Sequence, residues 1–344
     1  MTGIIRVIWV ISIFLWTCGS AFAEGELKFA ELADFSLENG KVIRECRLGY
    51  RTFGKMNQEK SNIIFFPTWF TGTSEELVAL GFIGSGKAVD TEKYFVIAFD
   101  NIGNGVSSSP SNSKTQQEGA FPEFSSMDMV RAGHILLKEH LRINRLHAIV
   151  GISMGGMHAF QWVVSYPDFM RKAVSISGTT KPTSYDLLLW QAEIQAINAA
   201  MNCKKEEGLA MKTVAPLHTL ATRTPHYFAT KIKSDEFAET LARTEESLKK
   251  YNPYNWLWQM KAMMTHDIFK QFGGSEDRAA KAVRARLLIV AAEQDYMVYP
   301  EPGLMFAKSL KAETFRLSGD CGHFSFLCEK AALQSVVSSF LEKP

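Results

Sequence analysis

The chain has 344 residues, of which 46% are hydrophobic and 22% are charged, and its formal net charge is +2. This composition is typical of a globular protein with a large core, for which we expect one α/β domain with an insertion. A net charge near zero, without a basic stripe interleaved with aromatic residues, argues against nucleic acid as a partner.

The first 23 residues differ from the rest of the chain. Arg6 is their only charged residue, an apolar run covers residues 7–16, and the sequence AFA ends at Ala23. This pattern predicts a cleavable export signal at residues 1–23, cut after Ala23. The mature protein would then be secreted or periplasmic, without stable membrane association. An uncleaved membrane anchor is the alternative.

Four cysteines remain after that signal: Cys46, Cys203, Cys321 and Cys328. An exported protein can hold disulfides, and four cysteines allow three pairings, among which the sequence does not choose. The spacing of these cysteines with histidine does not resemble a zinc site. We therefore expect no metal and no cofactor.

From residue 24 onward, segments typical of buried strands alternate with segments of helical spacing. Strands are expected at residues 41–54 (as an extended pair), 61–70, 93–101, 145–153, 171–179, 285–295 and 313–318. Helices are expected at residues 73–84, 125–143, 154–167, 301–311 and 330–343. This alternation predicts a mostly parallel sheet flanked by helices, with ligands at the carboxyl ends of its strands.

The alternation is interrupted between about residues 181 and 280. This segment is rich in Leu, Ala, Met, Lys and Glu at helical spacing, and none of it is typical of a core strand. It predicts an inserted helical lid over the strand ends. Six of its side chains could line a substrate tunnel or simply form its core: Trp190, Trp256, Trp258, Met260, Met263 and Met264.

A G-x-S-x-G motif joins the strand at 145–153 to the helix at 154–167. Gly151 and Gly155 allow a sharp turn without Cβ clashes, and the turn would expose the hydroxyl of Ser153. The helix N-terminus beneath it offers free N–H groups and a positive dipole end. The motif therefore predicts a nucleophile, and an incidental serine in a glycine-rich turn is the alternative.

A serine nucleophile needs a general base. In an α/β-hydrolase-like sheet the three residues follow one another along the chain in the order serine, acid, histidine. His323 follows the last expected strand, so we predict it as the base. The other histidines after Ser153 are less suitable: His158, His218, His226 and His266. The adjacent pair His266 and Asp267 is expected on a surface helix.

The acid and the oxyanion donors complete the expected site. Asp295 follows the strand at 285–295 and is the preferred acid, with Glu293 as the alternate. The backbone N–H of Met154, directly after the nucleophile, is one expected oxyanion donor. The second donor should come from the loop after an earlier strand, where Phe70 is preferred and Trp69 is the alternate.

Six stretches of the sequence resemble the homoserine O-acetyltransferase group of the α/β-hydrolase fold: LGYRTFGKMN, FFPTWFTGTS, FVIAFDNIGNGVSSSPS, VGISMGGMHAFQWVVSYPD, ARLLIVAAEQDYMVYP and GHFSFL. The resemblance covers nearly all of residues 24–344 and is weakest in the lid. It implies an α/β-hydrolase domain and suggests a homodimer. It also implies the same site, with Ser153 as nucleophile, Asp295 as acid, His323 as base, and Phe70 and Met154 as oxyanion donors.

Two features depart from this family. Phe324 stands where the family has an aspartate for the amino group of homoserine, and the family's arginine-rich lid segment is not recognisable. An unpaired buried charge on the substrate would cost several kcal/mol, so homoserine is not expected. Export also separates the enzyme from acetyl-CoA.

The candidate site residues and the departures from the family are compatible with three functions. The leading expectation is an exported serine hydrolase that acts on a small-molecule ester or related acyl substrate with an apolar part. The alternative is an O-acyltransferase that uses the same triad toward another hydroxyl. A non-catalytic binding scaffold is the third reading, since fold alone does not establish activity.

Overall fold

The computed structural model describes residues 25–203 and 208–344, so the export signal expected at residues 1–23 lies outside the described residues. Eight strands form its central sheet: β1 (Lys28–Glu31), β4 (Arg47–Phe53), β5 (Ile63–Pro67), β8 (Phe95–Phe99), β9 (Leu146–Ile152), β10 (Met170–Ile176), β11 (Arg286–Ala292) and β12 (Glu313–Leu317). Their order across the sheet is β1-β4-β8-β5-β9-β10-β11-β12. The pairs β1·β4 and β4·β8 are antiparallel and the others are parallel, which confirms the mostly parallel sheet.

The inner strands are apolar because both of their faces are covered. In β5, Ile63 and Phe65 contact the hydrophobic core on one face, while Ile64 and Phe66 contact the core on the other. A strand alternates its side chains between faces, so a run of apolar residues is required to fill both cores.

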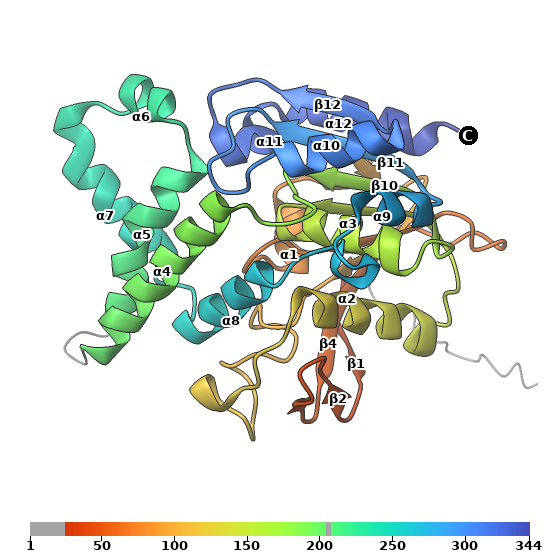
Figure 1. Ribbon diagram of the computed structural model, residues 1–344, viewed down its shortest axis with the longest axis horizontal. Coiled ribbons are helices and arrows are strands. Elements are labelled where there is room, and N and C mark those ends of the chain that lie inside the picture. Colours follow the sequence, from red (N-terminus) through yellow and green to blue (C-terminus); the bar gives the residue numbers. More distant parts are fainter. Residues whose placement is uncertain (1–24, 204–207) are drawn as a thin grey trace, which may run out of the picture.

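Helices cover both faces of the sheet (Figure 1). Side chains of α2 (Ser126–Ile135), α3 (Met154–Ser165), α9 (Glu276–Ala282) and α10 (Glu301–Leu310) belong to one core. Side chains of α1 (Ser74–Ala79), α11 (Ser325–Cys328) and α12 (Lys330–Glu342) belong to the other. The layers are those expected of a parallel sheet, which buries both faces.

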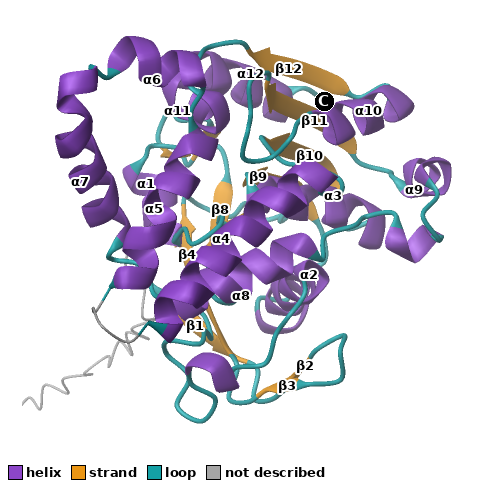
Figure 2. Cartoon of the chain, turned by 60° about the vertical axis from the view of Figure 1, so that its left-hand side comes forward, coloured by secondary structure: helices purple, strands orange, loops and turns teal. Residues whose placement is uncertain are grey.

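The lid consists of α4 (Ser184–Asn202), α5 (Leu209–Thr222), α6 (Pro225–Lys231), α7 (Phe237–Leu248) and α8 (Pro253–Met264). These helices stand together beside the sheet, on the left in Figure 1, and Figure 2 shows α4, α5 and α8 in front of it. Helix α5 packs against α4, α7 and the turn at Gly322–Phe324. Helix α9, although it overlaps the expected insertion, packs instead on α3 and α10.

One local expectation is wrong, and one differs in detail. The segment 41–54 does not form a strand pair: β3 (Val42–Ile43) pairs with β2 (Phe35–Ser36), whereas β4 joins the main sheet. Glu45, at φ 49°, redirects the chain between the two sheets. The helix expected at 125–143 is present as α2 and continues directly as a π-helical turn, Leu136–His140, so only the end of its expected range is not helical.

The helix expected at 73–84 is shorter than its pattern indicated. Thr73 caps its N-terminus and Glu76 completes a capping box, but the helix ends at Ala79, before Gly81 at φ 68°. The chain then forms β6 (Ile83–Gly84), which pairs with β7 (Val89–Asp90). Within the described residues, no helix is both long and apolar enough to cross a bilayer.

Candidate active site

Ser153 lies on a sharp turn between β9 and α3, at the carboxyl edge of the sheet. Its backbone has φ 55° and ψ −121°, a conformation that costs energy for a residue with a side chain. Neighbouring glycines are required, because a Cβ on Gly151 would meet the Gly155 carbonyl oxygen at 2.0 Å and one on Gly155 would meet the Pro67 carbonyl oxygen at 2.6 Å. The turn therefore holds the Ser153 hydroxyl above the strand ends.

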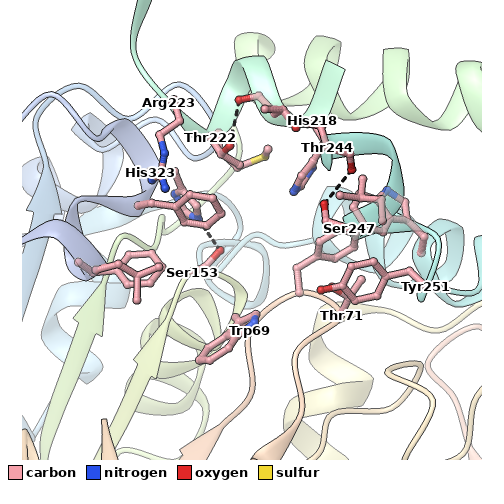
Figure 3. A pocket seen from close by; sticks show the side chains of 18 of the residues that line it. Trp69, Thr71, Ser153, His218, Thr222, Arg223, Thr244, Ser247, Tyr251 and His323 are labelled. Carbon is pink, nitrogen blue, oxygen red and sulfur yellow. Dashed lines mark hydrogen bonds between the residues drawn. The ribbon is translucent and has the colours of Figure 1, made fainter. Parts of the chain in front are cut away.

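The structure brings Ser153, His323 and Asp295 into one hydrogen-bonded line (Figure 3). The Ser153 hydroxyl lies 2.9 Å from Nε2 of His323, and Nδ1 of His323 lies 2.7 Å from Oδ2 of Asp295. All three residues are at least 94% buried, with exposed fractions of 6%, 4% and 3%. They come from turns after β9, β12 and β11, which end at the same edge because these strands are parallel.

The carboxylate of Asp295 is held in place by its own loop. Its Oδ1 accepts the backbone N–H groups of Met297 and Val298, both at 2.9 Å, which leaves Oδ2 for His323. The alternate acid, Glu293, points elsewhere and lies 3.6 Å from Arg316. A carboxylate that accepts from Nδ1 selects the tautomer whose Nε2 can accept the serine proton.

The other histidines after Ser153 have different environments. His158 is buried in α3, and burial lowers its pKa to about 3. His266 was expected on a surface helix with Asp267, which is wrong: it is 2% exposed, bonded to Ser126 and the Thr179 carbonyl, and burial lowers its pKa to about 4. His266 is buried because it packs against α2 and the segment after β10.

The two expected oxyanion donors come from different segments: Met154 directly follows Ser153 in the chain, and Phe70 lies in the loop after β5. Met154 is the first residue of α3, so its N–H has no acceptor within the helix. Phe70 and Trp69 both line the pocket that contains Ser153. The loop that carries Phe70 and Trp69 is hydrogen-bonded to the lid, because the Thr71 N–H donates to Gln259 Oε1 at 2.6 Å. Gln259 Nε2 in turn donates to the Ile102 carbonyl, which fixes the Gln259 side chain.

A pocket of about 500 Å³ opens above Ser153, between the strand ends and the lid. Trp69, Phe324 and Phe326 line it with rings on the sheet side. Of the side chains considered for a tunnel, Trp256, Met260 and Met263 line it. Trp190 and Trp258 are buried and donate to carbonyl oxygens of Met297 and Phe121, and Met264 packs against the core.

Two pocket residues were not assigned to the site from the sequence. Arg223 follows α5, and its guanidinium lies 4.5 Å from the centre of the Phe324 ring. Burial lowers the pKa of Arg223. His218 of α5 enters the pocket and is bonded to the buried carboxylate of Glu193. No local motif marks these residues, because the packing of the lid helices decides which of their faces reaches the pocket.

The structure selects one disulfide among the possible pairings. Cys321 and Cys328 are bonded across seven positions, and the short loop they close contains His323. Cys46 and Cys203 are free, and burial raises the pKa of the Cys46 thiol to about 12. Over residues 25–203 and 208–344, no group of three or more His, Cys, Asp or Glu side chains is arranged to hold a metal ion.

Comparison with known proteins agrees with this fold. Residues 62–198 match the family model of the alpha/beta hydrolase fold, and residues 134–296 match a family model of esterases. An ethyl acetate hydrolase of Pseudomonas veronii is 30% identical over 307 residues, which cover 85% of this chain and 87% of that protein. A homoserine O-acetyltransferase of Nautilia profundicola is 29% identical, over 89% of this chain and 95% of the relative.

A solved structure extends the similarity to three dimensions. The acetyl esterase MekB superposes with a TM-score of 0.85 at 27% identity, over 93% of this chain and 98% of that one. Esterases and acetyltransferases are thus both similar to this protein over most of its length. The chain belongs to the homoserine O-acetyltransferase-like group of the α/β-hydrolase fold.

Proposed function

We propose that this protein is a serine hydrolase that cleaves small acyl esters through an acyl-serine intermediate. The hydrogen-bonded line of Ser153, His323 and Asp295 at the floor of the pocket carries this proposal. Such a line deprotonates a hydroxyl as it attacks, which a serine alone does poorly at neutral pH. The similarity to an ethyl acetate hydrolase and to an acetyl esterase supports a short acyl ester.

The reaction has two half-reactions. The Ser153 Oγ attacks the ester carbonyl carbon while its proton passes to Nε2 of His323, and the N–H groups of Met154 and Phe70 stabilise the oxyanion. The carbon–oxygen bond to the alcohol then breaks, and His323 returns the proton to the leaving oxygen. Water attacks the acyl-serine by the same route, which releases the carboxylic acid and restores the serine. Asp295 stays ionised and stabilises the imidazolium.

The lining of the pocket supports an ester with an apolar acyl or alcohol part. Aromatic side chains of Trp69, Phe324 and Phe326 lie on the side of Ser153, and burial of a methylene against such surfaces contributes about 0.8 kcal/mol. Phe324 lines the pocket with a ring at the position where the family that the sequence resembles has an aspartate for the amino group of homoserine. A neutral ester therefore fits this side better than homoserine.

Export forms part of the proposal. The sequence of residues 1–23 has the pattern of a cleavable signal, and the Cys321–Cys328 disulfide is typical of proteins from oxidising compartments. Water is the acceptor that such a compartment supplies, whereas acetyl-CoA is cytosolic.

One observation favours a second candidate, an O-acyltransferase. Arg223 places a guanidinium in the pocket, where it could pair with the carboxylate of an acceptor alcohol. Homoserine O-acetyltransferases are also similar over most of this chain. A transferase would use the same acyl-serine and differ only in the second acceptor.

The test is hydrolysis of p-nitrophenyl esters of graded acyl length by the purified protein. We expect turnover that is highest for short chains, a loss of about 10⁶-fold in Ser153→Ala, and a loss of about 10⁴-fold in Asp295→Asn. Glu293→Gln is the matched control and should keep kcat, because Glu293 pairs with Arg316. Labelling of Ser153 by a fluorophosphonate separates an enzyme from a scaffold.

Two results would contradict the proposal. A folded wild-type protein that neither labels nor hydrolyses any ester would indicate a scaffold. Acyl-enzyme that passes to added alcohols or to homoserine far faster than to water would indicate the transferase.

A further inference from the structure

His218 extends from α5 into the pocket, across the cavity from Ser153 (Figure 3). The chemistry at Ser153 does not require it, since His323 already accepts the serine proton. Its ring packs against a pair of contacting aromatic rings, with centroid distances of 4.7 Å to Trp256 and 6.2 Å to Phe70. The imidazole is therefore fixed in orientation beside the loop that carries the expected oxyanion donor.

A buried carboxylate determines which nitrogen of His218 faces the pocket. Glu193 of α4 is 0% exposed, and its two oxygens lie 3.2 Å and 3.3 Å from Nδ1 of His218. Oε2 of Glu193 also accepts the indole N–H of Trp256 at 3.2 Å. Since a carboxylate accepts, Nδ1 carries a proton. In the neutral tautomer that this contact selects, Nε2 is a hydrogen-bond acceptor.

The walls of the pocket differ in character. Trp69, Phe324 and Phe326 give apolar surface on the side of Ser153. The side of His218 carries hydroxyl groups, which Figure 3 shows around the cavity: Thr71, Thr244, Ser247 and Tyr251. Ser247 Oγ donates to the Thr244 carbonyl at 2.7 Å, so its oxygen still has lone pairs that can accept. An acceptor nitrogen among hydroxyl groups fits a ligand group that both donates and accepts.

We propose that Nε2 of His218 accepts a hydrogen bond from a hydroxyl group of the substrate. The preferred ester then carries one hydroxyl beyond the reacting bond, either on its alcohol part or on its acyl part. This inference rests on the proposed ester hydrolysis and names its substrate class. An apolar group at the same place would leave Nε2 of His218 without a hydrogen-bond partner once water is expelled. The site should therefore discriminate against esters that lack the hydroxyl group.

Two pairs of nearly isosteric esters test the inference and separate the two sources of the hydroxyl. Ethylene glycol monoacetate and propyl acetate differ on the alcohol side, whereas ethyl lactate and ethyl isobutyrate differ on the acyl side. The quantity measured is the ratio of kcat/KM within each pair, for wild type and for His218→Phe. Intrinsic differences in ester reactivity, and any general loss of activity in the variant, cancel when the two ratios are compared.

We expect the preference for the hydroxylated ester to fall about tenfold in His218→Phe for one of the two pairs. The methyl ether of ethylene glycol monoacetate cannot donate, so wild type should not prefer it over its hydrocarbon analogue. His226→Phe is the matched control and should keep both ratios, because the His226 side chain is 69% exposed and lies outside the pocket. If His218→Phe is unstable, the double variant with Glu193→Gln avoids an unpaired buried carboxylate.

The outcomes distinguish this inference from the proposed function. Ratios that stay within twofold of wild type for both pairs would overturn the role of His218 while ester hydrolysis stands. An equal preference for the methyl ether would show that Nε2 donates, which would also overturn it. Failure of wild type to hydrolyse any of these esters would overturn the proposed function and this inference with it.

Discussion

Buried histidines of this protein differ in their partners, and the partners determine what each can do. His323 has a hydroxyl on one nitrogen and a carboxylate on the other. His266 bonds to Ser126 and to a backbone carbonyl, which serves packing of the lid segment. Nε2 of His158 has no hydrogen-bond partner among the described residues. A histidine in the sequence thus indicates a function only together with the residues that tertiary contact brings to it.

His158 should make stability depend on pH. Burial lowers its pKa to about 3 in the folded protein, while the unfolded chain binds a proton near pH 6.5. The unfolded state therefore binds more protons below that pH, and the free energy of unfolding decreases as the pH falls. In His158→Leu, the decrease between pH 7 and pH 5 should be smaller by about 2 kcal/mol.

Urea denaturation at the two pH values measures this difference, and His226→Leu is the exposed control. An unchanged pH dependence in His158→Leu would show that this histidine is protonated equally in both states.

At the scale of elements, the site depends on connections between the sheet and the lid. Gln259 of α8 bonds to Thr71 and to the Ile102 carbonyl, so a lid helix holds the loop on which Phe70 lies. Helix α5 packs on the turn that carries His323, and the Thr224 hydroxyl donates to the Asp320 carbonyl at 2.6 Å. The lid is therefore a structural support of the site as well as its cover.

The Cys321–Cys328 disulfide closes the short loop around His323. Without this cross-link the unfolded chain has more conformational entropy, so the free energy of unfolding should decrease by roughly 2–3 kcal/mol. In Cys321→Ser with Cys328→Ser, we also expect kcat to decrease and KM to rise, because the loop carries both the base His323 and the pocket rings of Phe324 and Phe326. Hydrolysis and denaturation of the double variant are the measurements.

A matched control is Cys203→Ser, since Cys203 is free and exposed. Wild-type kcat and stability in the double variant would show that the packing of α5 alone holds the loop.

For the whole molecule, the expected export signal and the disulfide make a joint prediction. Full-length protein expressed in a bacterial host should lose residues 1–23, appear outside the cytoplasm, and begin at Glu24 by N-terminal sequencing. Its Cys321 and Cys328 should be oxidised, because exported proteins encounter an oxidising environment. An intact N-terminus in a cytoplasmic protein would contradict export.

The sequence predicted the sheet because its requirements are local. An inner strand must be apolar on both faces, and a turn that presents Ser153 requires glycine at positions 151 and 155. Chain order then narrowed the choice of acid and base to the ends of the last strands, where the structure brings Asp295 and His323 to Ser153. Strand ends converge at one edge of any parallel sheet, so the sequence alone contains this information.

Only the tertiary structure decided the rest of the pocket. Several lid helices carry apolar residues at similar spacing, and no local pattern shows which face of each meets the strand ends or which helices are neighbours. The pairing of His218 with Glu193 depends on the packing of α5 against α4. The disulfide depends on the folded loop that brings the Cα atoms of Cys321 and Cys328 to 6.5 Å from each other. Contacts between distant segments arise from packing of the whole chain, which is why the sequence determined the fold and the tertiary structure determined the pocket.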